Sequence, residues 1–375
     1  MMKYLIFKIL LSIFKFIFYP FIFLPVTNKI TLISRMSDNK TLDIKLLERN
    51  LKLKYYDYKI VVLSDYFGKK ISKKIKYLLK MPKYVFYIYT SKIVICDCYI
   101  PAISLLKKKK SVTIIQVWHA SGAYKKFGYS SLNTYEGYES KYAKILKMHK
   151  NYDYVVATSD YSKTKFSEAF NINQDKIIIS HLPRYEYLLE NKEKFRDEII
   201  NRFSLNNNKI NILYAPTFRK SKRNYFKNVI DVINYDKYNL IIKKHGGIES
   251  IYINKKKVYE GTKNYDLKLL CVSDIVITDY SAITFDALSL NKKVLFYVPD
   301  YDKYLNERDI YEKITNGLYY KDINTLFKNI DSYKNIDIKK YLNLESYPIE
   351  FYIDKILKGE TIYEKLWYIS YYSII

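Results

Sequence analysis

SDIVITDYSAITFDALSLNKKVLFYVPD, the stretch from Ser273 to Asp300, decides the fold of this 375-residue chain. Its β-branched run at residues 275–278 is typical of a strand buried on both faces of a parallel sheet. The apolar pattern at 283–290 predicts a largely buried helix, and residues 294–298 predict a second strand. In open α/β sheets, ligands bind outside the carboxyl ends of the strands, where helix N-termini attract anions. The polar corner from Asp279 to Thr284 is therefore a candidate phosphate-binding corner, with an ordinary capped helix as the alternative.

The same alternation of strands and helices runs along most of the chain and predicts an α/β fold with two parallel-sheet domains. Strands are expected at residues 30–34, 59–64, 92–96, 111–117, 152–158, 177–180, 210–214, 240–243 and 257–259, and helices at 42–53, 71–79, 159–170, 190–203 and 267–270. The charged helix predicted at 190–203 and the three asparagines at 206–208 mark the boundary between two predicted domains, residues 29–203 and residues 204–345. Residues 346–375 form a helical tail that we expect to pack back across the domains.

Composition limits the partners that the protein can have. The chain contains 64 Lys and Arg against 38 Asp and Glu, a formal charge of +26, which favours an anionic partner. No nucleic-acid-binding signature is present, so nucleic acid ranks last and an anionic membrane surface or phosphate-rich substrate ranks higher. The three cysteines are best interpreted as free thiols of an intracellular protein. The four histidines have no zinc-type spacing, so we expect no metal site.

The most apolar stretch lies at the N-terminus, between Tyr4 and Pro25, in an expected membrane-association segment at residues 1–28. Lys8 and Lys15 are seven residues apart and would share one side of a helix. A spanning helix needs about 20 apolar residues with few charges, and Pro20 interrupts this one. The order of preference is an in-plane or shallow anchor, then a transmembrane helix, then a buried core helix.

Four polar corners follow predicted strands and carry the residues suited to chemistry. His119 follows the strand that ends at Val117, where a neutral imidazole can accept a proton from a substrate hydroxyl. Arg219 is placed to pair with phosphate in fork geometry, or lies on a solvated loop. Lys243–Gly247 combines cations, an imidazole and flexible backbone, or is a surface turn. The fourth corner begins at Asp279. Recurrence at strand ends in both halves favours one cleft between two domains.

At these corners the chain resembles the CDP-glycerol glycerophosphotransferase family, which builds teichoic-acid-type polymers. The motifs that carry the resemblance occur in the family's order: VWHASGAYKKFG at Val117–Gly128, LPR at Leu182–Arg184, LYAPTFR at Leu213–Arg219, KKH at Lys243–His245, and ITDYSAITFDAL with VLFYVPDYDKY at Ile277–Tyr304. ISRMSDNKTLDIKLLE at Ile33–Glu48 resembles the N-terminal region of a short bacterial branch. The resemblance covers roughly residues 30 to 320, and several ordered motifs are more specific than any one of them.

The resemblance implies two Rossmann-like domains of GT-B type facing across a cleft, and transfer of glycerol phosphate from CDP-glycerol to a lipid-linked or polymeric acceptor, releasing CMP. It implies that His119 is the general base and that His245 steadies the negative charge of the leaving group. It assigns donor and phosphate binding to Arg184, Thr217, Arg219, Lys244, Asp279, Tyr280, Ser281 and Thr284. No cofactor beyond the donor CDP-glycerol is expected, and the enzyme would work at the cytoplasmic face of the cell membrane.

Three departures from the family's pattern leave the donor open. Ala120 and Gly246 follow the two histidine motifs where many members have Gly and Pro, and His181 stands where Gly usually precedes LPR. CDP-ribitol is therefore an alternative donor. A GT-B glycosyltransferase using a nucleotide sugar, and a non-catalytic membrane-binding protein, are the rival functions.

Overall fold

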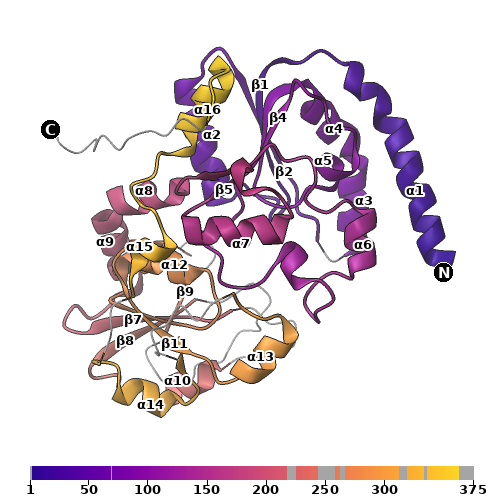
Figure 1. Ribbon diagram of the computed structural model, residues 1–375. Coiled ribbons are helices and arrows are strands. Elements are labelled where there is room, and N and C mark those ends of the chain that lie inside the picture. Colours follow the sequence, from indigo (N-terminus) through magenta and orange to yellow (C-terminus); the bar gives the residue numbers. More distant parts are fainter. Residues whose placement is uncertain are drawn as a thin grey trace.

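The protein, seen here as a computed structural model, has two α/β lobes (Figure 1). The structure describes residues 2–68, 70–217, 225–243, 258–261, 267–311, 319–332 and 336–362. Each lobe is built on a six-stranded sheet, and every strand pairing in both sheets is parallel. The predicted α/β class with two parallel sheets is confirmed.

The first sheet has the strand order β2-β1-β3-β4-β5-β6. Its strands are β1 (Thr27–Ser34), β2 (Lys59–Ser64), β3 (Ser91–Cys96), β4 (Thr113–Gln116), β5 (Tyr154–Ala157) and β6 (Ile177–Ile179). Its helices are α2 (Leu42–Lys54), α3 (Ile71–Leu79), α4 (Met81–Thr90), α5 (Pro101–Leu105), η2 (Gly128–Ser131), α6 (Ser140–Ile145), α7 (Asp160–Phe170) and η3 (Gln174–Lys176). The sequence did not predict α4, whose run of aromatic and β-branched residues has strand-like propensity but is buried as a helix.

The second sheet has the order β12-β11-β10-β7-β8-β9. Its strands are β7 (Ile210–Ala215), β8 (Tyr238–Lys243), β9 (Val258–Gly261), β10 (Ile275–Thr278), β11 (Lys293–Tyr297) and β12 (Tyr319–Tyr320). The helices of this half are α8 (Pro183–Glu190), α9 (Lys192–Phe203), α10 (Phe226–Val232), α11 (Lys268–Val272), α12 (Ile283–Ser289), α13 (Tyr301–Glu307) and α14 (Ile323–Lys328). Leu188, Phe195 and Ile199 join the hydrophobic core of this lobe, so α8 and α9 pack with the second sheet.

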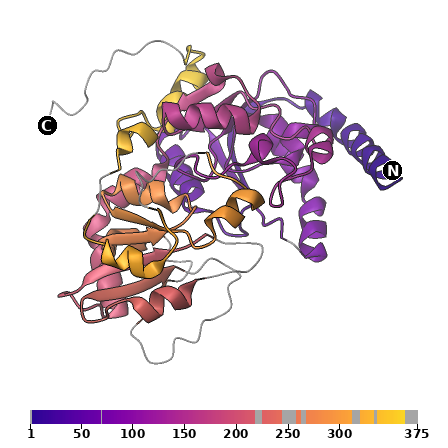
Figure 2. The same ribbon diagram turned by 60° about the horizontal axis from the view of Figure 1, so that its bottom comes forward.

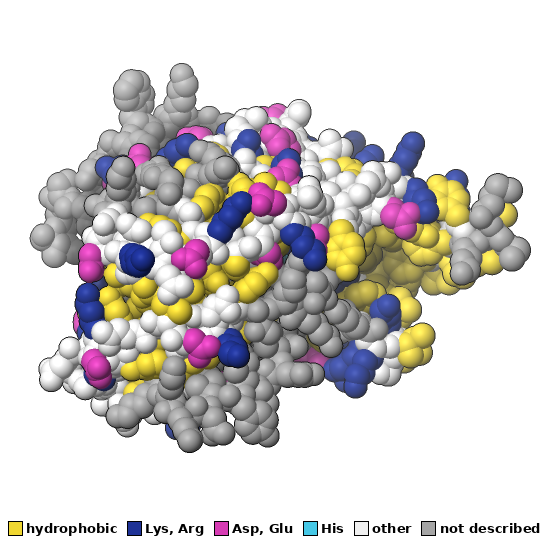
Figure 3. Space-filling view, turned by 90° about the horizontal axis from the view of Figure 1, so that it is seen from below, with side chains coloured by type: hydrophobic (Ala, Val, Ile, Leu, Met, Phe, Trp, Pro, Cys, Tyr) yellow, Lys and Arg dark blue, Asp and Glu magenta, His cyan; other side chains and the backbone are white. Residues whose placement is uncertain are grey.

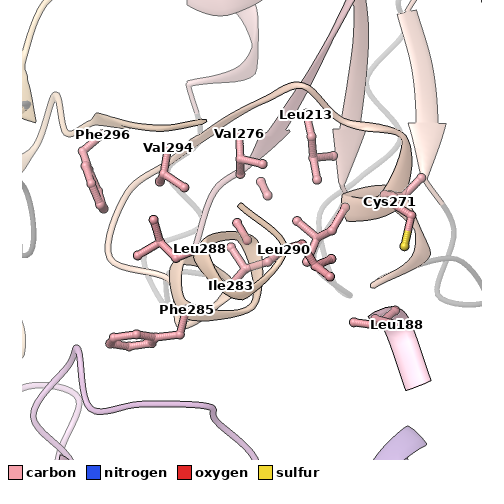
Figure 4. Close-up of a cluster of buried hydrophobic side chains, with 14 of the residues drawn as sticks. Leu188, Leu213, Cys271, Val276, Ile283, Phe285, Leu288, Leu290, Val294 and Phe296 are labelled. Carbon is pink, nitrogen blue, oxygen red and sulfur yellow. The ribbon is translucent and has the colours of Figure 1, made fainter. Parts of the chain in front are cut away.

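Helix α12 lies at the centre of the second core, as the opening stretch predicts. All four residues of β10 are buried, and Ile283, Leu288 and Leu290 pack against Val276 and the neighbouring strands (Figure 4). Phe285 points away from that sheet, toward the ribbon of the first lobe. The helix therefore contributes both to the core of its own lobe and to the contact between the lobes.

Local capping explains where helix α7 begins and ends. Ser159 and Ser162 form a capping box, in which each side chain accepts from the other residue's backbone N–H. The helix ends at Asn171, whose left-handed backbone (φ 50°) stops it. The cap predicted at Ser159 or Ser162 is confirmed, and it orients the helix that follows β5.

The chain crosses between the lobes twice. The first crossing is at residues 180–183, and the second follows α15 (Ile338–Tyr341) and leads to α16 (Ile349–Lys358) beside α2 (Figure 1). Ile349 and Ile353 are buried in a core cluster of the first lobe, so the described part of the tail packs back as predicted. The crossings touch each other, since the Ser346 hydroxyl lies 3.4 Å from His181 Nδ1.

The N-terminal helix α1 (Met2–Phe18) continues into η1 (Tyr19–Phe23) and projects along the outside of the first lobe (Figures 1 and 2). Its apolar side chains are largely exposed, 58% for Leu5 and 81% for Phe16. The buried core helix, the third alternative, is therefore wrong. The segment Tyr4–Phe23 has a mean hydropathy of 2.0 and is long enough to cross a membrane by length and composition. Figure 3 shows hydrophobic side chains gathered at the right of the view, on the side of the molecule where α1 lies.

Candidate active site

His119 lies at the carboxyl edge of the first sheet, just beyond β4, as predicted. Trp118, immediately before it, has a left-handed backbone (φ 57°), which is uncommon for a bulky residue and is typical of functional sites. The Trp118 N–H donates to Gln116 Oε1 at 2.9 Å, and the Trp118 ring stacks on Phe127 with centroids 4.8 Å apart. The turn that presents His119 is therefore held from both its backbone and its side chains.

The hydrogen bond of the His119 ring decides which nitrogen carries the proton. Nδ1 lies 2.9 Å from the backbone carbonyl oxygen of Asp97, which follows β3. A carbonyl can only accept, so Nδ1 is protonated and Nε2 keeps its lone pair. Burial lowers the pKa of His119 below its ordinary value and Arg184 lowers it further, whereas the hydrogen bond to Asp97 and that residue's charge act in the opposite direction. His119 is thus a neutral imidazole with Nε2 available as a base.

Arg184, at the start of α8, is held by two buried carboxylates. Its Nε lies 3.0 and 2.9 Å from the two Asp43 carboxylate oxygens, and its Nη1 lies 3.5 Å from Asp286 Oδ2. The Arg184 Nη2 also donates to the His119 carbonyl at 3.1 Å. Burial opposes its charge, but Asp43 and Asp286 hold the pKa of Arg184 above its ordinary value. This geometry indicates that Arg184 positions the His119 turn, and direct contact with a donor phosphate stays a prediction.

Asp286 of α12 joins the two lobes. It accepts a hydrogen bond from the Ser121 hydroxyl at 2.5 Å, and the Ser121 carbonyl in turn accepts one from the Thr158 hydroxyl. Burial raises the pKa of the Asp286 carboxyl, partly offset by Arg184 and Ser121. One carboxylate of the second lobe therefore contacts the His119 loop of the first lobe directly through Ser121.

Gly122 allows the lobes to approach closely. A Cβ atom at this position would lie 2.7 Å from two carbons of the Phe285 ring, closer than side-chain carbons pack. The glycine is therefore required by the contact between the His119 loop and α12, and the WHASG and ITFDAL motifs meet at this point.

Asp279 ties together the ends of two strands in the second lobe. Its Oδ1 accepts the backbone N–H of Thr217, beyond β7, at 2.8 Å and the N–H of Tyr280 at 2.6 Å. Thr217 and Asp279 are thus brought together at the carboxyl edge of the second sheet, as predicted. Both residues are buried, so the geometry shows Asp279 shaping this corner, and its contact with a donor stays a prediction.

Tyr280 occupies the core rather than the surface of this corner. Its ring is fully buried and stacks on Tyr304 with centroids 3.8 Å apart, and its hydroxyl lies 3.4 Å from Asp300 Oδ1. The ring fills the space beneath the corner, and donor binding by Tyr280 stays a prediction. A strand-end position alone could not reveal which way the side chain points.

Ser281 and Thr284 lie at the entry to α12. Ser281 is partly exposed and its hydroxyl accepts the Ile283 N–H at 3.4 Å. Thr284 is fully buried, and its hydroxyl has no hydrogen-bond partner within the described chain. The remaining predicted residues lie outside the described residues: the donor-binding Arg219 and Lys244, and the catalytic His245.

Three carboxylates of the site were not predicted: Asp43, Asp97 and Asp286. Each carboxylate stands in a largely apolar stretch or at a strand end. A charged residue in such a place could have indicated a site residue, because a buried carboxylate needs a partner. Among the described residues, no group of three or more His, Cys, Asp or Glu side chains could hold a metal ion.

Comparison with known proteins identifies relatives over most of the chain. Residues 17–351 match the family described as CDP-Glycerol:Poly(glycerophosphate) glycerophosphotransferase. A teichoic acid glycerol-phosphate primase of Bacillus subtilis is 30% identical, over 81% of this chain and 84% of its own. A teichoic acid ribitol-phosphate primase of Bacillus spizizenii is 29% identical, over 75% of this chain and 77% of its own.

Solved structures share the fold. A structure of the wall teichoic acid polymerase TagF superposes with a TM-score of 0.64 and 20% identity, over 89% of this chain and 84% of that one. A UDP-GlcNAc 2-epimerase from Neisseria meningitidis superposes with a TM-score of 0.57 and 15% identity, over 88% of this chain and 100% of that one. These similarities place the two lobes in a common GT-B-like architecture.

Proposed function

The chain belongs to the CDP-glycerol:poly(glycerophosphate) glycerophosphotransferase family, and on this premise we propose its reaction. The protein moves glycerol phosphate from CDP-glycerol to a hydroxyl of a lipid-linked or polymeric acceptor, in the synthesis of a teichoic-acid-like or capsular polymer. The observation that carries the proposal is the hydrogen bond of 2.9 Å between His119 Nδ1 and the Asp97 carbonyl. It leaves Nε2 as the proton acceptor that such a transfer requires.

The proposed step is a displacement at the donor's outer phosphorus. His119 Nε2 takes the proton from the acceptor hydroxyl, whose oxygen bonds to the phosphorus that carries glycerol. The bond from that phosphorus to the bridging oxygen breaks, and CMP leaves with the bridging oxygen and the negative charge. Catalysis of this kind depends mainly on positioning and charge stabilisation, which suits a base fixed by the Arg184 and Asp286 network.

We assign donor binding to the second lobe. The corner formed by Thr217 and Asp279 lies at the carboxyl edge of its sheet, where nucleotides bind in folds of this kind. Arg219 follows β7 in the sequence, and Lys244 and His245 follow β8. We propose that these three residues contact the donor pyrophosphate, with His245 beside the leaving CMP. TagF, in a variant soaked with CDPG, has the same fold, which supports CDP-glycerol as the donor.

The exposed apolar helix α1 supports a place at the cytoplasmic face of the membrane. An anionic bilayer and a lipid-linked acceptor both suit a chain of formal charge +26. In this arrangement α1 keeps the first lobe, and with it His119, close to the acceptor.

Nucleotide release tests the function. Purified protein with a membrane fraction is offered CDP-glycerol, CDP-ribitol and nucleotide sugars, and the nucleotide products are separated. We expect CMP from CDP-glycerol, lost in His119→Ala and retained in His181→Gln, which removes a buried histidine that is bonded to Glu186 and Ser346 instead of the proposed base. CMP from CDP-ribitol alone would favour the ribitol donor, as the 29% identical primase suggests. Release of a nucleoside diphosphate would identify a glycosyltransferase, and full activity in His119→Ala would remove His119 from the mechanism.

A further inference from the structure

Asp97 is a buried carboxylate beside the proposed base. It directly follows β3 at the carboxyl edge of the first sheet, and the residue is 1% exposed. Its backbone carbonyl accepts the hydrogen bond from His119 Nδ1 at 2.9 Å. Because the carboxyl group is joined to the same Cα atom through a single methylene, that bond also holds the carboxylate close to the imidazole ring. The two groups interact electrostatically, and each influences the pKa of the other.

The Asp97 carboxylate is only partly compensated. The Thr41 hydroxyl donates to Oδ2 at 3.2 Å, but among the described residues no donor reaches Oδ1 in hydrogen-bond geometry. No ion pair of the described chain includes Asp97, in contrast to Asp43, which is paired with Arg184. Burial raises the pKa of the Asp97 carboxyl, and His119 is the largest of the influences that oppose it. A raised pKa means that the charged form lacks compensation in the resting site.

The protonated form of His119 supplies the cation that Asp97 lacks. Burial lowers the pKa of His119, the charges of Asp97 and Asp43 raise it, and the charge of Arg184 lowers it. Arg184 is already bound to Asp43 and Asp286. Of the charged groups that act on the imidazole, Asp97 is therefore the carboxylate that has no cation of its own within the described ranges, and a proton on the ring provides one.

We propose that Asp97 is a positioning residue of the transfer: its carboxylate stabilises the imidazolium that His119 forms when it takes the proton from the acceptor hydroxyl. This inference rests on the proposed function. In that step a bond forms between His119 Nε2 and the proton, the O–H bond of the acceptor breaks, and its electron pair goes to the new bond with phosphorus; Asp97 exchanges no proton. Because the imidazolium forms only as transfer proceeds, the attraction lowers the free energy of the transition state more than that of the ground state.

The pH dependence of CMP release tests this role. Asp97→Asn keeps the shape of the side chain and the backbone carbonyl but removes the charge. The acidic limb of kcat/KM reports protonation of the base in the free enzyme. Without the carboxylate the imidazolium is less stable, so the pKa of His119 falls and the acidic limb should move to lower pH by about one unit or more. On the plateau at higher pH, kcat should fall about ten-fold, the factor that corresponds to one pKa unit. Asp97→Glu, which retains the charge, should leave the limb near its wild-type position.

Asp153→Asn is the matched control. Asp153 precedes β5 in the same lobe, and its Oδ2 accepts the backbone N–H of Ile114 at 2.8 Å, at the opposite edge of the sheet from His119. This variant should leave the acidic limb unchanged. Urea unfolding adds a second readout. Asp97→Asn should be at least as stable as the wild type, since it removes a poorly compensated buried charge, whereas the loss of a merely structural carboxylate would lower the free energy of unfolding.

The outcomes separate this proposal from the proposed function. An acidic limb and a kcat of Asp97→Asn equal to those of the wild type would overturn the role of Asp97, and so would a loss of activity with a loss of stability and an unmoved limb. If no donor releases CMP, the proposed function is refuted, and NMR titration of the His119 imidazole in the full chain in detergent still decides on Asp97. The chain has four histidines, so His119→Ala identifies the resonance. We expect its midpoint to lie at lower pH in Asp97→Asn; equal midpoints would overturn the proposal.

Discussion

Replacing Arg184 by Met tests whether this residue positions the site or binds the donor. The substitution keeps much of the side-chain volume but leaves two buried carboxylates, Asp43 and Asp286, without their cation; their side chains are 4% and 7% exposed. It also removes the donor to the His119 carbonyl. Breaking a buried ion pair by removing one partner costs about 3–5 kcal/mol. We expect the free energy of unfolding of Arg184→Met to fall by that amount at pH 7, and kcat to fall with it.

The assay is urea unfolding of wild type and variant, beside CMP release at varied CDP-glycerol. The matched control is Arg196→Met, since Arg196 pairs with Asp274 at 3.9 Å with side chains 37% and 42% exposed, and such surface pairs contribute about 0–1 kcal/mol. Adding Asp286→Asn to Arg184→Met should recover part of the stability, because it removes one uncompensated charge.

Two results would refute this reasoning. The first is a loss of stability in Arg184→Met no larger than in Arg196→Met. The second is a variant of normal stability and kcat whose KM for CDP-glycerol alone is raised, which would make Arg184 a donor-binding residue after all.

Two further predictions follow from the packing. Gly122→Ala places a Cβ atom 2.7 Å from the Phe285 ring, so it should lower the free energy of unfolding by about 1–3 kcal/mol and reduce transfer. Adding Phe285→Leu should restore part of both. Normal activity and melting temperature in the single variant would contradict the close contact. Burial lowers the pKa of His149 to about 3, so its contribution to stability is complete above pH about 6.5 and is lost on acidification, by up to about 1.4 kcal/mol per pH unit. His149→Phe should flatten that dependence in urea unfolding between pH 7 and 5, and equal slopes would exclude it.

Residue periodicity predicted the elements that place the site. The β-branched run of β10 and the apolar face of α12 are local patterns, and they have the predicted order and burial. His119 could be placed at the sheet edge because it directly follows an apolar strand. These features depend on residues that are neighbours in the sequence, so they can be recognised from one sequence alone.

The partners of the site residues could not be predicted in this way. The Asp43–Arg184 pair joins residues 141 positions apart. The carbonyl that fixes the His119 tautomer belongs to Asp97, and no sequence pattern links Asp97 to His119. Tyr280 shows the same limit, since its corner was located correctly but the direction of its ring depends on Tyr304. Such features follow from packing between distant segments, and the sequence pattern does not contain that information.

The two crossings between the lobes limit how the enzyme can open. Because the crossings touch at Ser346 and His181, they form a two-stranded hinge at one side of the interface. Two linking segments side by side permit rotation about the hinge axis but resist twisting and sliding of one lobe against the other. We therefore expect a hinge opening of the lobes that separates Ser121 from Asp286. A single proteolytic cut in the second crossing would leave the two lobes covalently joined through the first. A cut in the first crossing would instead release the first lobe as a separate chain, held to the second by non-covalent contacts that include the packing of α16.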